Sequence, residues 1–405
     1  PLAAAVYDYP SRTMDIVGVT GTNGKTTVTH FVESMVERAG VRAGLIGTIA
    51  TRVGGVSMPS VRTTPEASDL QRTLRRMRDL GTQVVAAEIS SHALALHRID
   101  ATRFAVVAFT NLSQDHLDFH GDMDSYLAAK ARLFEDFEAG VAVINIDDAA
   151  GRDLAERFQG DVLTVGRLGQ VSWTDVSHAG SGTSFELSTP WGTRRVETPV
   201  LGLFNVENAV MASACCLALG LDFDAVVTGL TTLGPVPGRF ELVSDDDPIR
   251  VIVDYAHTPA AVELAISSAR ELGGGRVIAV LGAGGDRDRS KRPLMGTALS
   301  AADLAIVTSD NPRSEDPQVV ASEVAAGLRS GTEYVVDVDR RSAIFRAVAA
   351  ANDGDMVLIL GRGHEPSQEV AGAKIPFDDR EVAREALEVR RGSTAFADDS
   401  GSMGP

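Results

Sequence analysis

Short runs of consecutive apolar residues alternate with helical patterns along the first half of the chain. Such runs lie at residues 14–19, 84–88, 104–110 and 141–145. By contrast, residues 27–39 carry apolar side chains at the spacing of a helix. Continuous apolar strands separated by helices predict a parallel sheet that is covered on both faces. Ligands bind such sheets at the carboxyl ends of the strands, so a functional site is expected at that edge.

Residues 160–200 follow a different pattern. Apolar and polar residues alternate over 183–188 and 192–197, which predicts an antiparallel insertion within residues 160–200. The segment 234–239 then holds two prolines and two glycines, and such a turn-rich stretch indicates a domain boundary.

A second unit of alternating strands and helices follows this boundary. Its apolar runs lie at residues 250–254, 276–281, 304–308 and 356–360. We therefore expect one α/β domain at residues 1–236 and a second α/β domain at 237–392. The remaining residues, 393–405, are small and polar and predict a disordered tail.

Composition narrows the classes of function. The chain has 405 residues and a formal net charge of −17, which argues against a general nucleic-acid or anionic-membrane binder. Its two cysteines, Cys215 and Cys216, are adjacent in an apolar run, so a disulfide framework and a cysteine-rich zinc site are excluded. No apolar stretch is long enough to span a bilayer. We expect a monomeric protein of the cytoplasm that binds neither nucleic acid nor membrane.

The glycine-rich segment at residues 20–27 carries the clearest chemistry. It follows a predicted strand and opens a predicted helix, so backbone N–H groups and the helix N-terminus can surround phosphate oxygens. Lys25 would contact the β- and γ-phosphates of ATP, and Thr26 could hold Mg²⁺. The predicted nucleotide-binding residues of this loop are Gly21, Thr22, Asn23, Gly24, Lys25, Thr26 and Thr27.

Carboxylate and imidazole groups follow the next two predicted strands. Glu88 ends one strand, and His116 follows another. A helix cap, a salt bridge or a structural histidine would explain such residues singly, but both lie where the magnesium of the loop is expected. Lys130 lies in a helical pattern, which on its own indicates a solvated surface lysine.

The second domain has its own charged loops. Asp310-Asn-Pro-Arg313 follows one predicted strand, and Gly361-Arg-Gly-His-Glu365 follows another. Arg313 offers a planar fork suited to a carboxylate, so Arg313 and Glu365 could face one substrate that carries both charges. Alternatively, these exposed charges pair only with each other. A glycine turn at residues 282–287 could form a second nucleotide site, but a contact to the first nucleotide or to the substrate is more economical.

Taken together, these motifs resemble the Mur ligases in order and in spacing, from the start of the chain to about residue 390. The matching segments are residues 20–27, 63–65, 88–94, 110–112, 115–118, 203–208, 237–239 and 254–259. The resemblance implies an α/β fold with a central P-loop ATPase domain, which has a mostly parallel sheet and a small antiparallel insertion. A Rossmann-like α/β C-terminal domain would follow. It also implies an ATP-dependent ligase of peptidoglycan precursor synthesis that forms an amide through an acyl phosphate.

Asp310-Asn-Pro-Arg313 is similar to the signature of the family branch that adds meso-diaminopimelate to UDP-N-acetylmuramoyl-L-alanyl-D-glutamate. By this resemblance Thr26 and Glu88 serve one Mg²⁺, His116 with Glu88 serves a second, and Lys130 is carbamylated. The catalytic set is then Lys25, Glu88, His116 and Lys130, and Asn208 and Arg239 add to the nucleotide site. The muramoyl substrate is assigned to Thr63, Thr64, Ser90 and Arg98, and diaminopimelate to Arg287, Asp310, Asn311, Arg313, Gly361 and Glu365.

Three departures from the family pattern stand out. The uridine-binding N-terminal domain of the family is absent from this sequence, which leaves uridine recognition open. Arg362 stands where lysine is usual, and Leu96 stands where a glutamine often contacts the substrate.

Other functions remain open at this point. They include a lysine-adding or relaxed ligase, a ligase of folate polyglutamation or cyanophycin synthesis, and a chain that is inactive without an N-terminal domain. A partner subunit of a glutamine amidotransferase usually carries a cysteine-rich zinc insertion, which two adjacent cysteines cannot supply. A plain P-loop NTPase switch would hydrolyse nucleotide without any dependence on an amino acid.

Overall fold

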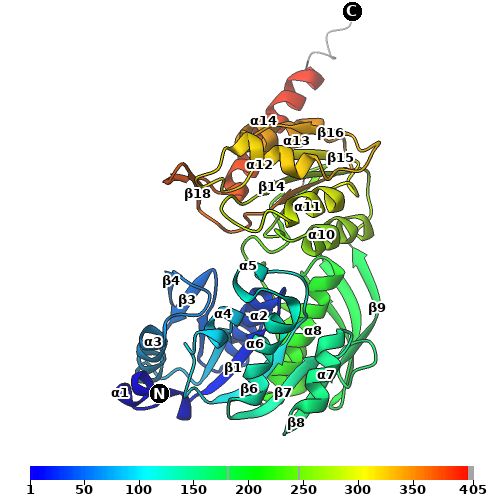
Figure 1. Cartoon of the computed structure of the whole chain (residues 1–405). Helices are drawn as coiled ribbons and strands as arrows, with labels where there is room; N and C mark the ends of the chain where they lie inside the picture. Colours follow the sequence, from blue (N-terminus) through cyan, green and yellow to red (C-terminus); the bar gives the residue numbers. More distant parts are fainter. Residues whose placement is uncertain (180–181, 245–246, 400–405) are drawn as a thin grey trace, which may run out of the picture. The chain divides into compact units, whose positions relative to one another are not determined.

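A computed structural model describes residues 1–179, 182–244 and 247–399. The chain divides into two units, Pro1–Gly234 and Pro235–Pro405, which run from blue to green and from green to red in Figure 1. This division falls at the turn-rich segment whose prolines and glycines predicted a boundary at residues 236 and 237.

The first unit is built on an eight-stranded sheet of order β4-β3-β2-β5-β1-β6-β7-β8. Strands β2, β5, β1, β6, β7 and β8 run parallel, and β3 and β4 extend the sheet as an antiparallel hairpin. The bounds are β1 Asp15–Thr20, β2 Ala43–Ile46, β3 Ala50–Val53, β4 Val56–Pro59, β5 Val84–Glu88, β6 Phe104–Phe109, β7 Ala139–Asn145 and β8 Asp161–Val165. Val19 pairs with Glu88, and Thr20 pairs with Phe109, so the loops after β1, β5 and β6 meet at one edge.

Helices cover both faces of this sheet. Side chains of α3, α4, α6 and α7 pack with one face of the strands in a single core cluster. Helix α2 contacts β1, β2 and β5 and packs against α8 and α9 on the other face (Figure 1). The helices are α1 Leu2–Val6, the 3-10 turn Pro10–Arg12, α2 Lys25–Arg38, α3 Ala67–Asp79, α4 Ser91–Ala95, α5 Leu117–His120, α6 Met123–Glu135, α7 Ala149–Arg157, α8 Leu203–Ala218 and α9 Phe223–Thr231.

An antiparallel sheet of three strands completes the first unit, as expected. It has the order β11-β10-β9, with β9 Ser172–Ala179, β10 Gly182–Thr189 and β11 Gly192–Thr198. Residues 161–165, at the start of the segment that was expected to follow a different pattern, instead form β8, which pairs in parallel with β7 in the main sheet. The reason is that Leu163 and Val165 are buried as part of the main sheet.

The second unit has a six-stranded sheet of order β12-β13-β17-β14-β15-β16, parallel except for β12. Its strands are β12 Glu241–Leu242, β13 Arg250–Asp254, β14 Val277–Ala283, β15 Leu304–Ser309, β16 Tyr334–Val336 and β17 Met356–Leu360, and a separate hairpin holds β18 Ser367–Val370 and β19 Ala373–Pro376. Helices α13 and α14 pack on one face in a shared core cluster. The helices are α10 Pro259–Glu271, α11 Lys291–Leu299, α12 Pro317–Ala325, α13 Arg340–Ala350 and α14 Asp379–Asp399.

The predicted fold class is confirmed: two α/β units with mostly parallel sheets, the first carrying an antiparallel insertion. The disordered tail was predicted from residue 393, whereas α14 is helical to Asp399. Residues 395–397 read Ala-Phe-Ala, without proline, and alanine favours a continued helix. Residues 400–405 lie outside the described part of the chain. Within that part, no helix combines the length and the apolar character that crossing a membrane requires.

Candidate active site

The glycine-rich loop connects the end of β1 at Thr20 to the start of α2 at Lys25. Gly21 has a φ of +144°, and a Cβ there would overlap Thr110 Oγ1. Gly24 has a φ of +87°, and a Cβ there would overlap Asn208 Oδ1. The loop therefore needs glycine at these two positions for backbone conformation and for space.

Hydrogen bonds to the loop after β6 hold this backbone in place. The N–H of Thr22 donates to the carbonyl oxygen of Asn111 at 2.8 Å, and the N–H of Asn23 donates to Asn111 Oδ1 at 2.9 Å. Thr110 Oγ1 donates to the carbonyl oxygen of Asn23 at 2.6 Å. These hydrogen bonds fix the backbone of the predicted phosphate-binding loop, and a preorganised loop lowers the entropic cost of binding a ligand.

Two lysines meet at this loop. Lys25 Nζ donates to the carbonyl oxygens of Gly21 and Thr22, each at 2.8 Å. Lys130 Nζ, on α6, donates to the same oxygen of Gly21 at 2.8 Å and lies 4.4 Å from the ring centroid of Tyr126. Lys130 is fully buried, and this burial, helped by the positive charge of Lys25, lowers the pKa of its amine well below the ordinary value. The sequence pattern had indicated a surface lysine, so that interpretation of Lys130 is wrong.

Glu88 brings carboxylate oxygens to the same edge of the sheet. Its side chain is fully buried. Oε2 accepts hydrogen bonds from Thr26 Oγ1 at 2.9 Å and from Thr48 Oγ1 at 3.0 Å, and Oε1 accepts from the N–H of Thr48 at 2.7 Å. The oxygens of Thr26 and Glu88 are hard donors beside a phosphate-binding loop, which is the ligand type that Mg²⁺ prefers.

His116 lies in a more open position, with 44% of its side chain exposed. It precedes α5 with a φ of +55°, and its Nε2 is 3.5 Å from Asp115 Oδ2. Its ring lies edge-on to that of His92, at 4.9 Å between centroids. Among the described residues, no group of three or more His, Cys, Asp or Glu side chains is placed to hold a metal ion. The two-metal ligand set built on Glu88 and His116 therefore stays a prediction.

The residues predicted to hold the muramoyl peptide lie around Glu88. Thr64 Oγ1 donates to the carbonyl oxygen of Glu88 at 2.7 Å and accepts from the N–H of Ser90 at 3.0 Å. Thr63 Oγ1 is 3.0 Å from the hydroxyl of Thr48. Arg98 pairs with Glu66 at 3.1 Å, while its buried Nε has no hydrogen-bond partner among the described residues. A buried donor of this kind is suited to an anionic ligand.

In the second unit, the loops after β15 and β17 meet. Asn311 Nδ2 donates to Glu365 Oε2 at 2.7 Å. Gly361 has a φ of +114°, and a Cβ there would approach Asp310 Oδ2. Burial, followed by the negative charge of Asp310, raises the pKa of Glu365. These four predicted residues therefore form one polar cluster at the carboxyl ends of the strands.

Arg313 is presented by a constrained backbone. Its φ is +52°, its N–H donates to the carbonyl oxygen of Glu369 at 3.1 Å, and it forms a bridge with Val370. Its Nη1 donates to the carbonyl oxygen of Gly285 at 2.6 Å, and 23% of its side chain is exposed. Arg287 lies exposed on the loop that contains Gly285. Two cations are thus carried by adjacent loops.

Arg239 lies over the ring of Tyr255, with its guanidinium carbon 4.3 Å from the ring centroid. Next to Tyr255, the buried Asp254 accepts hydrogen bonds from the N–H groups of Phe240 at 2.6 Å and Ala256 at 2.8 Å. Burial raises the pKa of this carboxyl. A flat, partly cationic surface of this kind can stack against an aromatic base.

Comparison with known proteins places this geometry in a family. A family model described as "Mur ligase middle domain" matches residues 19–216, and one described as "Mur ligase, glutamate ligase domain" matches residues 238–363. The chain belongs to the Mur ligase family. This Mur ligase is accordingly an ATP-dependent enzyme that forms an amide bond, as its sequence predicted.

Several relatives are close over most of their length. A UDP-N-acetylmuramoyl-L-alanyl-D-glutamate–2,6-diaminopimelate ligase of Geobacillus thermodenitrificans is 44% identical over 401 residues, covering 96% of this chain and 82% of the relative. A protein of the same name from Gloeobacter violaceus is 46% identical over 395 residues, covering 96% of this chain and 80% of the relative. A solved structure of a ligase with this name matches with a TM-score of 0.68 and 34% identity, over 96% of this chain and 82% of that one.

Two residues that contact the predicted site residues were not themselves predicted. Thr48 donates twice to Glu88, yet it lies in a short turn between β2 and β3 without a distinctive motif. Arg362, noted only as a departure from lysine, is fully buried and donates to Asn311 Oδ1 at 3.0 Å and to the carbonyl oxygen of Phe377 at 3.1 Å. Only its position between two glycines of a strand-end loop hinted at such a role.

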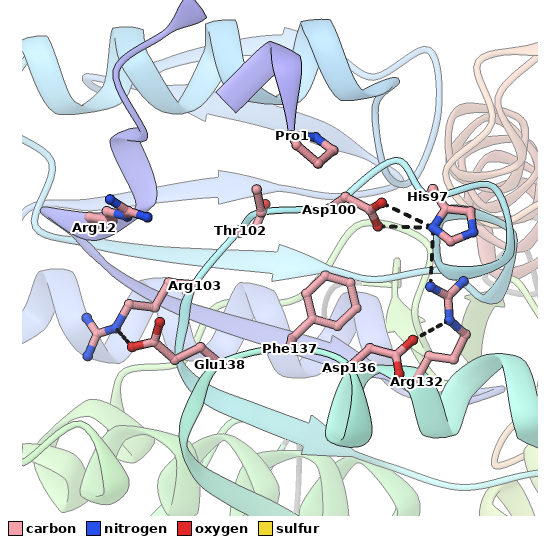
Figure 2. Close-up of a pocket in the computed structure, with 11 residues that line it drawn as sticks. Pro1, Arg12, His97, Asp100, Thr102, Arg103, Arg132, Asp136, Phe137 and Glu138 are labelled. Atoms are coloured by element: carbon pink, nitrogen blue, oxygen red, sulfur yellow. Dashed lines mark hydrogen bonds and ion pairs between the residues drawn. The ribbon is translucent and has the colours of Figure 1, made fainter. Parts of the chain in front are cut away.

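Figure 2 shows a pocket in the first unit that holds none of the predicted site residues. Its residues Arg12 and Arg103 precede the first residues of β1 and β6, so it lies at the amino ends of these strands, opposite the loop edge. Its charges pair with one another in Figure 2, as His97 does with Asp100 at 3.1 Å and Arg103 with Glu138 at 2.9 Å. Arg12 instead lies over the ring of Tyr9, with its guanidinium carbon 4.4 Å from the ring centroid, so most charged side chains of the pocket have partners within the first unit.

Proposed function

We propose that this Mur ligase adds meso-diaminopimelate to UDP-N-acetylmuramoyl-L-alanyl-D-glutamate at the expense of ATP. The relatives at 44% and 46% identity bear the name of that reaction. The observation that carries the proposal is that Arg313 follows β15, while Glu365, which accepts a hydrogen bond from Asn311, follows β17. A cation and an anion thus follow the carboxyl ends of two strands of one parallel sheet. An amino-acid end with its own carboxylate and ammonium group would find a partner for each charge there.

The first step makes a leaving group. A carboxylate oxygen of the D-glutamate residue attacks the γ-phosphorus of ATP, the bond from that phosphorus to the bridging oxygen breaks, and ADP leaves. The product is an acyl phosphate. Lys25 and the N–H groups of the loop around Gly24 would bind the phosphates, because a helix N-terminus and a cation stabilise the charge that develops.

Magnesium fits the oxygen donors beside the loop. Thr26 and Glu88 would hold the ion, since their oxygens lie 2.9 Å apart and Glu88 is buried at the strand end. When bound, Mg²⁺ neutralises charge on the transferring phosphoryl group. His116 would take part in a second site together with Glu88.

Lys130 is proposed to carry a carbamate. Burial lowers the pKa of its amine well below the ordinary value and so favours the neutral form, which is the form that reacts with CO₂ by forming an N–C bond and losing a proton. An ammonium group beside Mg²⁺ would be repelled, whereas a carbamate oxygen is an anionic donor. The burial of Lys130 and its hydrogen bond to the carbonyl oxygen of Gly21, in the predicted phosphate-binding loop, support this proposal.

The second step forms the amide. The amine of diaminopimelate attacks the acyl carbon, the bond from that carbon to the phosphate oxygen breaks, and the amine loses a proton. Arg313 would bind a carboxylate at the end of diaminopimelate that does not react, and Asp310 and Glu365 would bind its ammonium group. Arg287, Asn311 and Gly361 would complete this site, and Arg98 with Thr63, Thr64 and Ser90 would hold the muramoyl substrate.

Product analysis of the full-length protein tests this proposal. With ATP, the UDP-linked dipeptide and meso-diaminopimelate, we expect the dipeptide to gain one diaminopimelate residue while ADP and phosphate form in equal amounts. Omitting either the UDP-linked dipeptide or meso-diaminopimelate should stop phosphate release. If phosphate is released at the same rate with and without the amino acid, the protein is instead an NTPase switch.

A further inference from the structure

Two loops of the second unit carry the predicted substrate cations, and they are bonded directly to each other. Arg287 follows β14, and Arg313 follows β15. The N–H of Gly285 donates to the carbonyl oxygen of Asn311 at 2.9 Å, and Arg313 Nη1 donates back to the carbonyl oxygen of Gly285 at 2.6 Å. The distance between Arg287 and Arg313 therefore depends on how these two loops are held.

Arg292, at the start of α11, connects the two loops through its side chain. Its side chain is 1% exposed, although it carries a full charge. Nη2 donates to Glu315 Oε1 at 2.6 Å and Nη1 to Glu315 Oε2 at 2.9 Å, which is a bidentate pair. Nη2 also donates to the carbonyl oxygen of Gly284 at 3.1 Å, so one guanidinium group contacts both loops.

Glu315 also bonds to both of these loops. Its Oε1 accepts the N–H of Asp286 at 2.6 Å, and its own N–H donates to the carbonyl oxygen of Pro312 at 3.0 Å. The carboxylate of Asp286 in turn accepts from the N–H of Ser314 at 3.1 Å and from its hydroxyl at 2.7 Å. The loops are thus cross-linked on both sides of the two cations.

We infer that Arg292 and Glu315 are positioning residues for the incoming amino acid: their ion pair sets the spacing between Arg287 and Arg313. This inference rests on the proposed function, since it assigns both cations to one substrate. Neither Arg292 nor Glu315 is assigned a substrate contact. Arg292 also pairs with Glu323 Oε2 at 2.7 Å, so removing Glu315 leaves its charge compensated but breaks the bidentate link to the loop after β15. The loops can then shift, and a shift of about 1 Å is enough to weaken a fitted site.

The experiment compares Glu315→Gln and Arg292→Lys with a matched control in the full-length protein. The control is Asp355→Asn, because Asp355 also accepts an arginine fork and a backbone N–H, both from Arg276. Asp355 precedes the first residue of β17, at the opposite edge of the sheet. The readouts are kcat, the KM values for ATP and for the amino acid, and the melting temperature.

The positioning role predicts that both test variants raise the KM for diaminopimelate by about tenfold, while kcat and the KM for ATP change by less than about twofold. Asp355→Asn should lower the melting temperature without changing the KM for the amino acid. If either test variant fails to fold, Ser314→Ala removes only one cross-link and should raise the same KM by about threefold.

The inference is overturned if the folded variants keep the wild-type KM for the amino acid, or if Asp355→Asn raises it equally. The amino acid that the wild type couples is identified first. If it is not diaminopimelate, the proposed function fails, and the same comparison made with that amino acid still decides the role of Arg292 and Glu315.

Discussion

Lys25 and Lys130 donate to one and the same acceptor, the carbonyl oxygen of Gly21, each at 2.8 Å. Two amines on one oxygen favour a state in which only one of them is charged, because like charges at this separation repel. Lys130 is the buried partner, and its burial lowers the pKa of its amine and so favours the neutral form there. A neutral amine beside a phosphate-binding loop is the state from which a carbamate forms.

Lys130→Ala should reduce turnover by at least about a hundredfold, because an anionic group beside the phosphates would be lost. Added short-chain carboxylic acids should restore part of the activity by supplying a carboxylate in its place. The measurement is kcat with and without such acids. Lys374→Ala serves as the control, since Lys374 is exposed on β19, and it should neither lose activity nor respond. Loss without any rescue would argue against the carbamate.

Gly21→Ala should weaken ATP binding by at least about tenfold, because a Cβ would overlap Thr110 Oγ1 in a backbone that alanine rarely adopts. Gly40→Ala is the matched control: Gly40 also has a positive φ, +80°, but a Cβ there meets nothing within 4 Å. It should cost about 1 kcal/mol of stability and leave ATP binding unchanged. Equal ATP affinity in the two variants would show that the loop tolerates a shift.

Glu33 makes the stability of the first unit depend on pH. It pairs with Arg52, yet its side chain is only 3% exposed, and burial raises the pKa of its carboxyl from 4.5 to about 7. Because the folded state binds this proton more tightly than the unfolded state, the contribution of Glu33 to stability falls as the pH rises from 4.5 through about 7. Above that window the full cost of the buried charge remains.

Glu33→Gln should therefore gain stability relative to the wild type between about pH 5 and pH 8, by about 1–3 kcal/mol. Melting temperatures across this range measure the gain. Glu156→Gln, which alters an exposed carboxylate on α7, should follow the wild type throughout. If the Glu33 variant also runs parallel to the wild type, the buried carboxylate does not titrate in this window.

The glycine-rich loop and its flanking strand and helix could be predicted because they are formed by residues that are close in sequence. A strand, a glycine turn and a helix are neighbours in the chain, so the loop at Gly21 and Gly24 could be placed from its pattern. The parallel order of the strands then put Glu88 and Thr110 at the same edge.

What could not be predicted depends on distant partners. Lys130 lies in an ordinary helical pattern, and the residues next to it in sequence do not indicate that its amine will donate a hydrogen bond to the carbonyl oxygen of Gly21. Arg292 is similar, since charged side chains are rarely buried and its partner Glu315 is 23 residues away. The deviation of β8 from the expected insertion has the same origin, because only pairing with β7 assigns it to the main sheet.

Arg313 is the residue that we propose selects the amino-acid substrate. Arg313→Ala should raise the KM for diaminopimelate by roughly thirtyfold, the equivalent of about 2 kcal/mol, because a carboxylate would lose its charged partner. The KM for ATP should stay constant. Arg270→Ala is the control. Arg270 lies on α10, outside the loop that carries Arg313, and it pairs with Asp303 at 3.0 Å. A lower kcat with an unchanged KM would assign Arg313 another role.

The most direct test of the central claim is the ratio of kcat/KM for meso-diaminopimelate to that for lysine, measured by phosphate release in the full-length wild type and in Arg313→Ala. Lysine lacks the second carboxylate that Arg313 would bind. We expect a ratio of at least about thirty in the wild type that falls towards one in the variant. A wild type that uses lysine as well as diaminopimelate, or a variant that keeps the wild-type ratio, would contradict it.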